Sequence, residues 1–200
     1  MQRFLANKFS APLRQIKQGV LVGAPCDVFI NHRGVDTKRN VAGLLYNCLI
    51  QHNLHPFLDA KSMKAGDKLF ESIELAITHC KVGVTIFSPR YCESYFCMLE
   101  LARLVESKKK LIPIFCDVKP SELQFKGHEK CTPKEIERFG RALEEAKYTV
   151  GLAFDSQNGN WTDLMASATD IILNSIEGRG NREENSFYFN SFGSNVFLAK

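Results

Sequence analysis

The stretch VGVTIF, residues 82–87, decides the fold class of this 200-residue chain. Its β-branched and aromatic residues form a short apolar run, which indicates a strand buried on both faces of a sheet. Residues 69–77 before it and residues 97–105 after it carry apolar side chains at helical spacing. A buried strand between two amphipathic helices is typical of a parallel sheet with helices on both faces.

The same alternation of strand and helix continues in both directions along the chain. Further strands are expected at residues 27–30, 55–58, 111–115 and 148–154. Five strands that alternate with helices predict an α/β, flavodoxin-like fold with a five-stranded parallel sheet. Pro113 lies inside the fourth strand, and because proline cannot donate to a ladder we expect this strand near an edge or a bulge. Residues 132–135, TPKE, form a capping box that opens a later helix.

We expect one domain, at residues 25–176, between two tails. Residues 1–24 predict a basic, flexible arm, and residues 177–200, rich in Asn, Ser, Gly and Phe, predict a mostly disordered tail. The first 26 residues carry four basic and no acidic side chains, whereas the other 174 carry 22 of each. Because this composition is also typical of transit peptides, organelle targeting stays open as an alternative for the arm.

Composition and motifs exclude several classes of function. A domain with no net charge has no overall basic excess for nucleic acid, which argues against nucleic-acid binding and leaves only a local basic patch open. No stretch reaches the roughly 18 apolar residues of a membrane span. The seven cysteines are odd in number and form no CxxC pair, which indicates a reducing compartment: the cytoplasm, with the nucleus also open. No histidine or cysteine stands at zinc-site spacing, and no GxSxG, HExxH or phosphate-loop motif occurs. We therefore expect neither a metal nor a cofactor.

Ligands bind beyond the carboxyl ends of the strands in such sheets, so the loops there are the candidate sites. In the loop at residues 31–38, Gly34 permits a sharp turn, and Asp36 or Thr37 can cap the following helix. Arg33 beside free backbone N–H groups suits a phosphate or carboxylate, and an ordinary turn with a solvated arginine is the alternative. The polar loop at residues 59–67 can act as a lid or be solvated only.

The third candidate segment carries a carboxylate beside an aromatic side chain. Phe96 and Glu100 are four residues apart and share one helix face. Glu100 lies beside the apolar stripe of its helix, where a carboxylate can hold a positive ligand or stabilise a forming cation. The alternative is a surface glutamate that pairs with Arg103, three residues on.

Taken together, these segments resemble the motifs of the plant TIR (Toll/interleukin-1 receptor-like) family, of the TIR-only type. Residues 27–37, DVFINHRGVDT, resemble its DVFxSFRGxDT motif, and residues 87–101 resemble FSxxYxxSxWCLxEL. The second motif, FxDxxxLxRGxxI, is matched at Phe57, Asp59, Met63, Gly66 and Leu69, and residues 117–121 resemble the family's turn after the fourth strand. The resemblance covers residues 25–175 in the family's order and spacing.

The resemblance implies a flavodoxin-like enzyme, an NAD⁺ glycohydrolase or cyclase. Such domains cleave the nicotinamide–ribose bond to give nicotinamide and ADP-ribose or cyclic variants, which act in plant immune and cell-death signalling. The implied partners are NAD⁺ as substrate, the chain itself or other TIR domains, and lipase-like immune heterodimers that sense the products. The resemblance assigns catalysis to Glu100, and substrate binding to His32, Arg33, Gly34, Lys38, Lys64, Ser94, Phe96 and Cys97.

The chain departs from the family at four places. His32 replaces a phenylalanine, Phe96 replaces a tryptophan, and Ala65 replaces a basic lid residue. Gly43 and Leu44 occupy the position of a Ser-His pair that builds a self-association face. These changes leave a non-enzymatic adaptor that binds other TIR domains as the main alternative. A phospho-acceptor receiver domain shares the fold class, but it would require acidic residues where residues 31–33 are Asn, His and Arg.

Overall fold

The structure is a computed structural model that describes residues 25–62, 68–178 and 196–197. Five parallel strands form a sheet in the order β2-β1-β3-β4-β5, and a two-residue strand, β6, pairs antiparallel with β5 at the edge. The expected five-stranded parallel sheet is confirmed. The strands are β1 (Val28–His32), β2 (Pro56–Phe57), β3 (Val82–Phe87), β4 (Lys110–Cys116), β5 (Gly151–Phe154) and β6 (Val196–Phe197).

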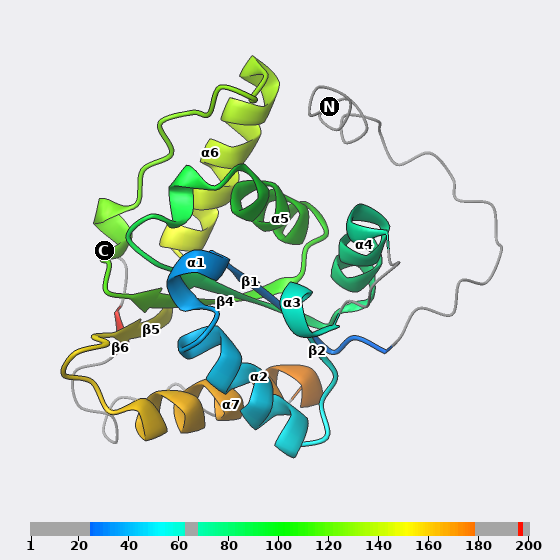
Figure 1. Cartoon of the computed structure of the whole chain (residues 1–200), viewed down its shortest axis with the longest axis vertical. Helices are drawn as coiled ribbons and strands as arrows, with labels where there is room; N and C mark the ends of the chain where they lie inside the picture. Colours follow the sequence, from blue (N-terminus) through cyan, green and yellow to red (C-terminus); the bar gives the residue numbers. More distant parts are fainter. Residues whose placement is uncertain (1–24, 63–67, 179–195, 198–200) are drawn as a thin grey trace, which may run out of the picture.

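Helices cover both faces of this sheet, as Figure 1 shows, with α2 and α7 on one face and α4, α5 and α6 on the other. Three shorter helices, α1, α3 and η2, follow the carboxyl ends of β1, β2 and β3. The helices are α1 (Gly34–Thr37), α2 (Val41–Gln51), α3 (Asp59–Ser62), α4 (Leu69–His79), η2 (Tyr91–Glu93), α5 (Tyr95–Glu106), η3 (Pro120–Glu122), α6 (Pro133–Lys147) and α7 (Trp161–Glu177).

The sheet has a hydrophobic core on each of its two faces, because successive side chains along a strand point to opposite faces. Val28 and Ile30 of β1 pack under α2 and α7, whereas Phe29 between them packs with α4 on the other face. Gly83 in the central strand lets α5 approach closely, because a Cβ there would lie 2.8 Å from a methyl group of Leu104. This close packing brings the last turn of α5 against the start of the central strand.

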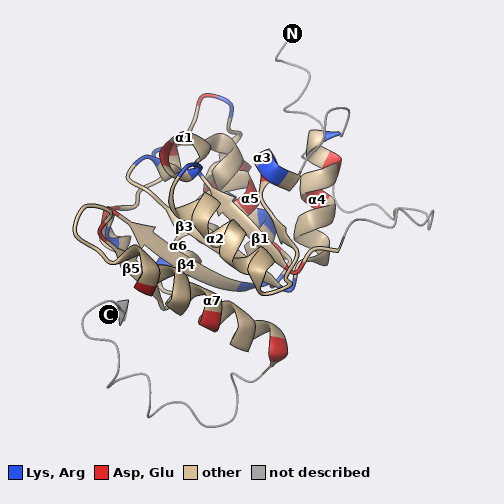
Figure 2. Cartoon of the chain, turned by 60° about the horizontal axis from the view of Figure 1, so that its bottom comes forward, with Lys and Arg blue, Asp and Glu red and all other residues tan. Residues whose placement is uncertain are grey.

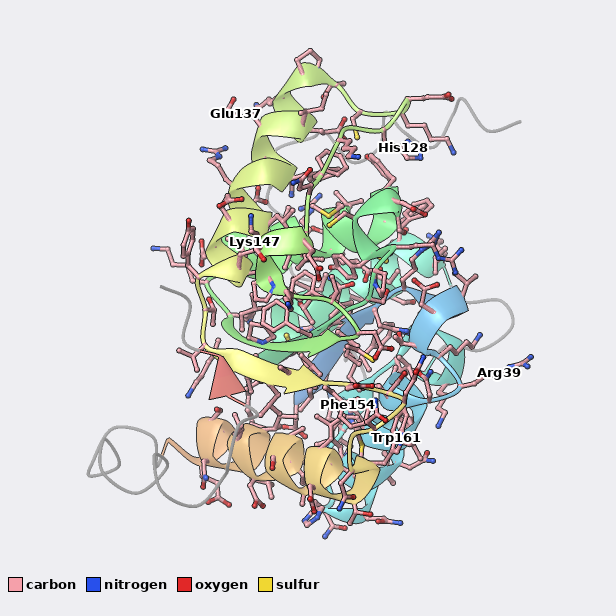
Figure 3. The ribbon with its side chains drawn as sticks, turned by 90° about the vertical axis from the view of Figure 1, so that its left-hand side faces the viewer. Arg39, His128, Glu137, Lys147, Phe154 and Trp161 are labelled. Atoms are coloured by element: carbon pink, nitrogen blue, oxygen red, sulfur yellow. The ribbon has the colours of Figure 1, made fainter. Side chains whose placement is uncertain are left out.

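Helix α7, the last helix of the described residues, covers the same face of the sheet as α2. The ring of Trp161, at its start, meets the ring of Phe154 edge-on at 4.7 Å, and Figure 3 shows the two side chains together. Asn160 caps the helix by accepting from the backbone N–H groups of residues 162 and 163. The charged residues of α7 are all acidic and all exposed, at 163, 170 and 177, and Figure 2 shows red but no blue along this helix.

Strand β4, which we expected near an edge or a bulge because of its proline, lies inside the sheet. It lies between β3 and β5, with Pro113 opposite Thr85 of β3. The β5 register begins one residue later, at Ile114, so Pro113 precedes that ladder. Gly151 lies beside the proline, and a Cβ on it would meet the Pro113 oxygen at 2.5 Å. An interior proline fits here because its neighbour has no side chain.

The segment after β1 also differs from the expectation. Asn31 and His32 are the last residues of the strand and are buried, not part of a loop. Asn40 caps α2, because its side chain accepts from the Val41 N–H, while Asp36 and Thr37 lie inside α1. Strand β6 falls in the segment expected to be a disordered tail, most of which lies outside the described residues. The capping box of α6 is confirmed, since Thr132 and Glu135 exchange hydrogen bonds.

Candidate active site

A cavity opens at the carboxyl edge of the sheet, beside the point where the chain order reverses between β1 and β3. Crevices at such points bind ligands in open α/β sheets. The cavity volume is about 140 Å³, whereas one water needs about 10–15 Å³ by the same measure. A group of the size of an aromatic ring therefore fits. Its walls are Phe29, Ile30, His32, Gly34, Phe57, Asp59, Ser94, Phe96, Cys97 and Glu100.

Helix α5 brings three of these side chains to the cavity and its N-cap Ser94 a fourth, and hydrogen bonds to β1 hold the start of the helix. The Asn31 Nδ2 group donates to the Tyr91 hydroxyl at 2.6 Å and to the Cys97 carbonyl at 3.1 Å. The Tyr91 hydroxyl donates to the same carbonyl at 3.0 Å. Ser94 caps the helix by accepting from the Cys97 N–H. Because these groups are buried, they fix the first turn of α5 against the end of β1.

Glu100 is a partly buried carboxyl group in this cavity. Burial raises its pKa to about 8, and the nearby Asp59 adds to that shift. Within the described part of the chain, no side chain makes a hydrogen bond or ion pair with it. The alternative of a surface pair with Arg103 is wrong, because Arg103 instead binds Glu74 of α4 at 3.0 Å. Glu100 thus remains available for a ligand.

His32 is a buried residue of the cavity wall. Its ring is buried, and Nδ1 lies 3.0 Å from the Thr37 hydroxyl of α1. Nε2 is buried without a hydrogen-bond partner and lies 3.8 Å from a carboxylate oxygen of Asp59. A buried polar atom without a partner is costly, so this nitrogen is a candidate ligand contact.

Phe96 and Cys97 have different positions in the wall. The Phe96 side chain is 50% exposed and lies against Phe70 and Tyr95, at ring distances of 6.0 and 5.5 Å. The Cys97 thiol donates to the His32 carbonyl at 3.3 Å. Burial, with Glu100 nearby, raises the thiol pKa to about 12, so it stays neutral and is no nucleophile. Phe96 therefore offers a face to a ligand, while Cys97 serves to join α5 to β1.

Two predicted binding residues lie outside the cavity walls. Arg33 points to carboxylates, at 3.5 Å from Asp36 and 3.2 Å from Glu93 of η2. Asp36 is in turn held by Ser88 and Arg90, which leaves no open anion seat at the start of α1. Lys38 ends α1, where its N–H donates to the Gly34 carbonyl. Lys64, the predicted lid residue, lies outside the described residues.

Sequence comparison decides the family. Residues 28–134 match the TIR domain family. A 155-residue segment is 52% identical to a Brachypodium distachyon protein named "Probable 2' cyclic ADP-D-ribose synthase BdTIR", over 76% of this chain and 69% of that protein. The chain belongs to the TIR domain family.

Two more proteins that resemble this TIR domain are a plant resistance protein and the TIR domains of a resistosome. It is 29% identical to "TMV resistance protein N" of Nicotiana glutinosa, over 75% of this chain but only 14% of that protein. The TIR domains in "Structure of the activated Roq1 resistosome directly recognizing the pathogen effector XopQ" superpose with a TM-score of 0.60 and 27% identity. That match covers 76% of this chain and 99% of the solved one.

The cavity of this TIR domain unites six of the predicted site residues and adds others. Asp59, Phe57, Phe29 and Ile30 were not assigned to the site from the sequence. The sequence could have assigned Asp59 to the site, because Asp59 matches the second motif and directly follows the end of an expected strand. Among the described residues, no three His, Cys, Asp or Glu side chains group as a metal site, and no helix could span a membrane.

Proposed function

We propose that this TIR domain is an NAD⁺ nucleosidase that cleaves the nicotinamide–ribose bond. The observation that carries the proposal is Glu100, an ionisable group without a partner among the described residues, in a cavity that also holds Asp59 and Phe96. An unpaired carboxyl group with a displaced pKa in a cleft is typical of a functional site. The name of the Brachypodium relative supports a product of the ADP-ribose or cyclic ADP-ribose class.

The reaction needs little acid catalysis, because nicotinamide leaves as a neutral molecule from a pyridinium. The C1′–N bond breaks, its electron pair leaves with nicotinamide, and the ribosyl carbon becomes an oxocarbenium-like cation. The Glu100 carboxylate would face this cation and hydrogen-bond the ribose hydroxyls, which lowers the barrier because the interaction strengthens as charge develops. Phe96 would stack against a ring of the substrate. A water or a hydroxyl or adenine of the same molecule captures the cation.

Substrate binding would change the protonation of Glu100. Before substrate binds, its pKa of about 8 leaves the carboxyl group mostly protonated at neutral pH. NAD⁺ brings a positive pyridinium into the cavity, and an opposite charge favours the carboxylate. We expect the bound substrate to displace this proton, so that the charged form is present when the bond breaks.

The proposal includes a setting for the activity. Plant resistance proteins among the relatives support a role in immune and cell-death signalling, and the resistosome supports assembly with itself or other TIR domains. We propose that lipase-like immune heterodimers sense the products, that the chain acts in the cytoplasm, and that it needs no cofactor beyond its substrate. Assembly predicts that the rate per molecule rises with protein concentration, which a dilution series measures.

The test is nicotinamide release from NAD⁺ at high protein concentration, with every ADP-ribose species separated by chromatography. Glu100→Gln keeps the size of the side chain and should lower the rate by about 10²–10³-fold. Glu106→Gln is the matched control, because Glu106 lies on the same helix but pairs with Arg138 outside the cavity. Full activity of Glu100→Gln would contradict the proposal. No product from the wild type, even when clustered, would favour a non-enzymatic adaptor.

A further inference from the structure

Among the fully buried side-chain nitrogen and oxygen atoms of the described cavity walls, His32 Nε2 alone lacks a hydrogen-bond partner. Its side chain is 3% exposed, and Nε2 is fully buried. Glu100 and Asp59 line the same cavity from α5 and α3. The ring thus stands where a substrate hydroxyl near the ribosyl carbon would meet a nitrogen and two carboxyl groups.

Thr37 assigns the tautomer of this ring. The Thr37 hydroxyl donates its single hydrogen to the Arg33 carbonyl, one helical turn back, at 3.2 Å. Its oxygen is then free to accept from His32 Nδ1, at 3.0 Å. This arrangement leaves no buried hydrogen without an acceptor, whereas the other tautomer would bury an unpaired Nε2–H, since Asp59 at 3.8 Å is too far. The neutral ring therefore carries its proton on Nδ1 and presents the Nε2 lone pair to the cavity.

We propose that His32 Nε2 is the base that accepts the proton of the hydroxyl that captures the ribosyl cation, an inference that rests on the proposed NAD⁺ cleavage. When C1′ has lost nicotinamide, an oxygen lone pair of water or of a ribose hydroxyl forms the C1′–O bond. The O–H bond breaks at the same stage, and its proton passes to Nε2. The imidazolium later returns this proton to solvent, so that no oxidant or further reactant is needed.

The surroundings of the ring favour this proton transfer. Protonation creates a positive charge 3.8 Å from the Asp59 carboxylate, which stabilises it. Nδ1–H keeps its bond to Thr37 throughout, so the ring need not turn. Glu100 and His32 thus have separate steps: Glu100 stabilises the cation that forms, and His32 activates the hydroxyl that consumes it.

A pyridine nucleophile separates these two steps, because its ring nitrogen attacks C1′ without losing a proton. The experiment gives NAD⁺ and 3-acetylpyridine to the full chain and measures two rates: formation of ADP-ribose species by hydroxyl capture, and formation of the exchanged dinucleotide. The readout is the ratio of capture to exchange. In His32→Phe we expect this ratio to fall by about 10²-fold, the usual contribution of a positioned base. A disturbance of the fold would lower both rates together and leave the ratio unchanged.

Thr37 supplies a second variant that keeps the imidazole. Thr37→Val removes the oxygen that holds Nδ1–H, so the ratio should fall several-fold, whereas Thr37→Ser should preserve it. An unchanged ratio in both His32→Phe and Thr37→Val would overturn the role of His32 while the nucleosidase stands. If the wild type yields neither capture nor exchange, both the proposed function and this inference fail. A ratio that falls in both variants and is kept by Thr37→Ser supports the inference even if His32→Phe is less stable.

Discussion

Two carboxyl groups at opposite edges of the sheet, Asp27 and Glu100, have opposite surroundings. Asp27 lies before β1 at the amino edge, where one oxygen accepts from the backbone and ring nitrogens of His55 at 3.0 and 2.8 Å. Its other oxygen lies 2.9 Å from the Lys81 ammonium. Burial alone would raise the pKa of Asp27, but the bonds from Lys81 and His55 outweigh it and hold the pKa below its usual value. Glu100 has no such partner among the described residues, and burial raises its pKa to about 8.

Asp27 is a carboxylate that stabilises the fold, whereas burial of Glu100 lowers the stability of the fold. Burying an ionisable group without a partner is unfavourable, so a chain keeps one only where something else uses it. At the amino edge, Asp27, His55 and Lys81 satisfy one another within the protein. The carboxyl edge leaves Glu100 and the Nε2 atom of His32 for a ligand.

The largest expected effect is on stability when Glu100 becomes neutral. The folded-state pKa of about 8 lies above the usual 4.5, so the wild type loses stability as pH rises from 4.5 to 8. Each unit of pKa is worth about 1.4 kcal/mol, so the loss is several kcal/mol at most, and less because the side chain keeps some exposure. Glu100→Gln lacks this titration. In urea unfolding, the variant should have a higher free energy of unfolding than the wild type at pH 9, and the difference should be smaller at pH 5. A difference that does not change with pH would contradict the comparison.

The opposite substitution tests the other half of the comparison. The lowered pKa of Asp27 means that its contribution is present above pH 3.8 and is lost as pH falls. Asp27→Asn weakens hydrogen bonds to a charged acceptor, so it should lower the free energy of unfolding by about 1–3 kcal/mol at pH 7. The same urea unfolding series measures it. A variant as stable as the wild type would show that the amino-edge ion pairs are too solvated to matter, and nicotinamide release should persist in either case.

The third prediction concerns the pH dependence of catalysis. If the carboxylate of Glu100 is the active form, kcat/KM should rise about tenfold per pH unit below about 8 and level off above it. Asp59 contributes to the raised pKa, after burial, so Asp59→Asn should move the midpoint to lower pH. A pH–rate series over pH 5.5 to 9.5 for both proteins measures the shift. A midpoint that does not move would show that burial alone sets the pKa.

Much of this comparison could be predicted from the sequence, because it depends on local periodicity. Helical spacing placed Glu100 beside the core stripe and one turn from Phe96, and strand order placed the ligand site at the carboxyl edge. The capping box at Thr132 was likewise visible, since its hydrogen bonds join residues three apart.

The remaining features depend on contacts between distant segments, which no local pattern records. Glu74 takes Arg103 away from Glu100 across 29 residues, and Glu93 draws Arg33 from the cavity across 60. Pro113 fits an interior strand only because Gly151 lies beside it. For Arg103, Arg33 and Pro113 the sequence shows which residue is present, but the neighbour that it contacts comes from a distant segment of the chain.

The smallest expected effect concerns the aromatic wall of the cavity. Phe96 is half-exposed one turn from Glu100, and an aromatic contact is worth about 0.5–1.5 kcal/mol beyond its buried area. Phe96→Ala should therefore raise KM for NAD⁺ by about two- to tenfold with little change in kcat, while Phe96→Trp should hold or lower it. Tyr148→Ala is the control, because that ring is 69% exposed at the far end of α6. If Phe96→Ala lowered kcat with KM unchanged, the ring would act on the transition state, and the division of labour with Glu100 would need revision.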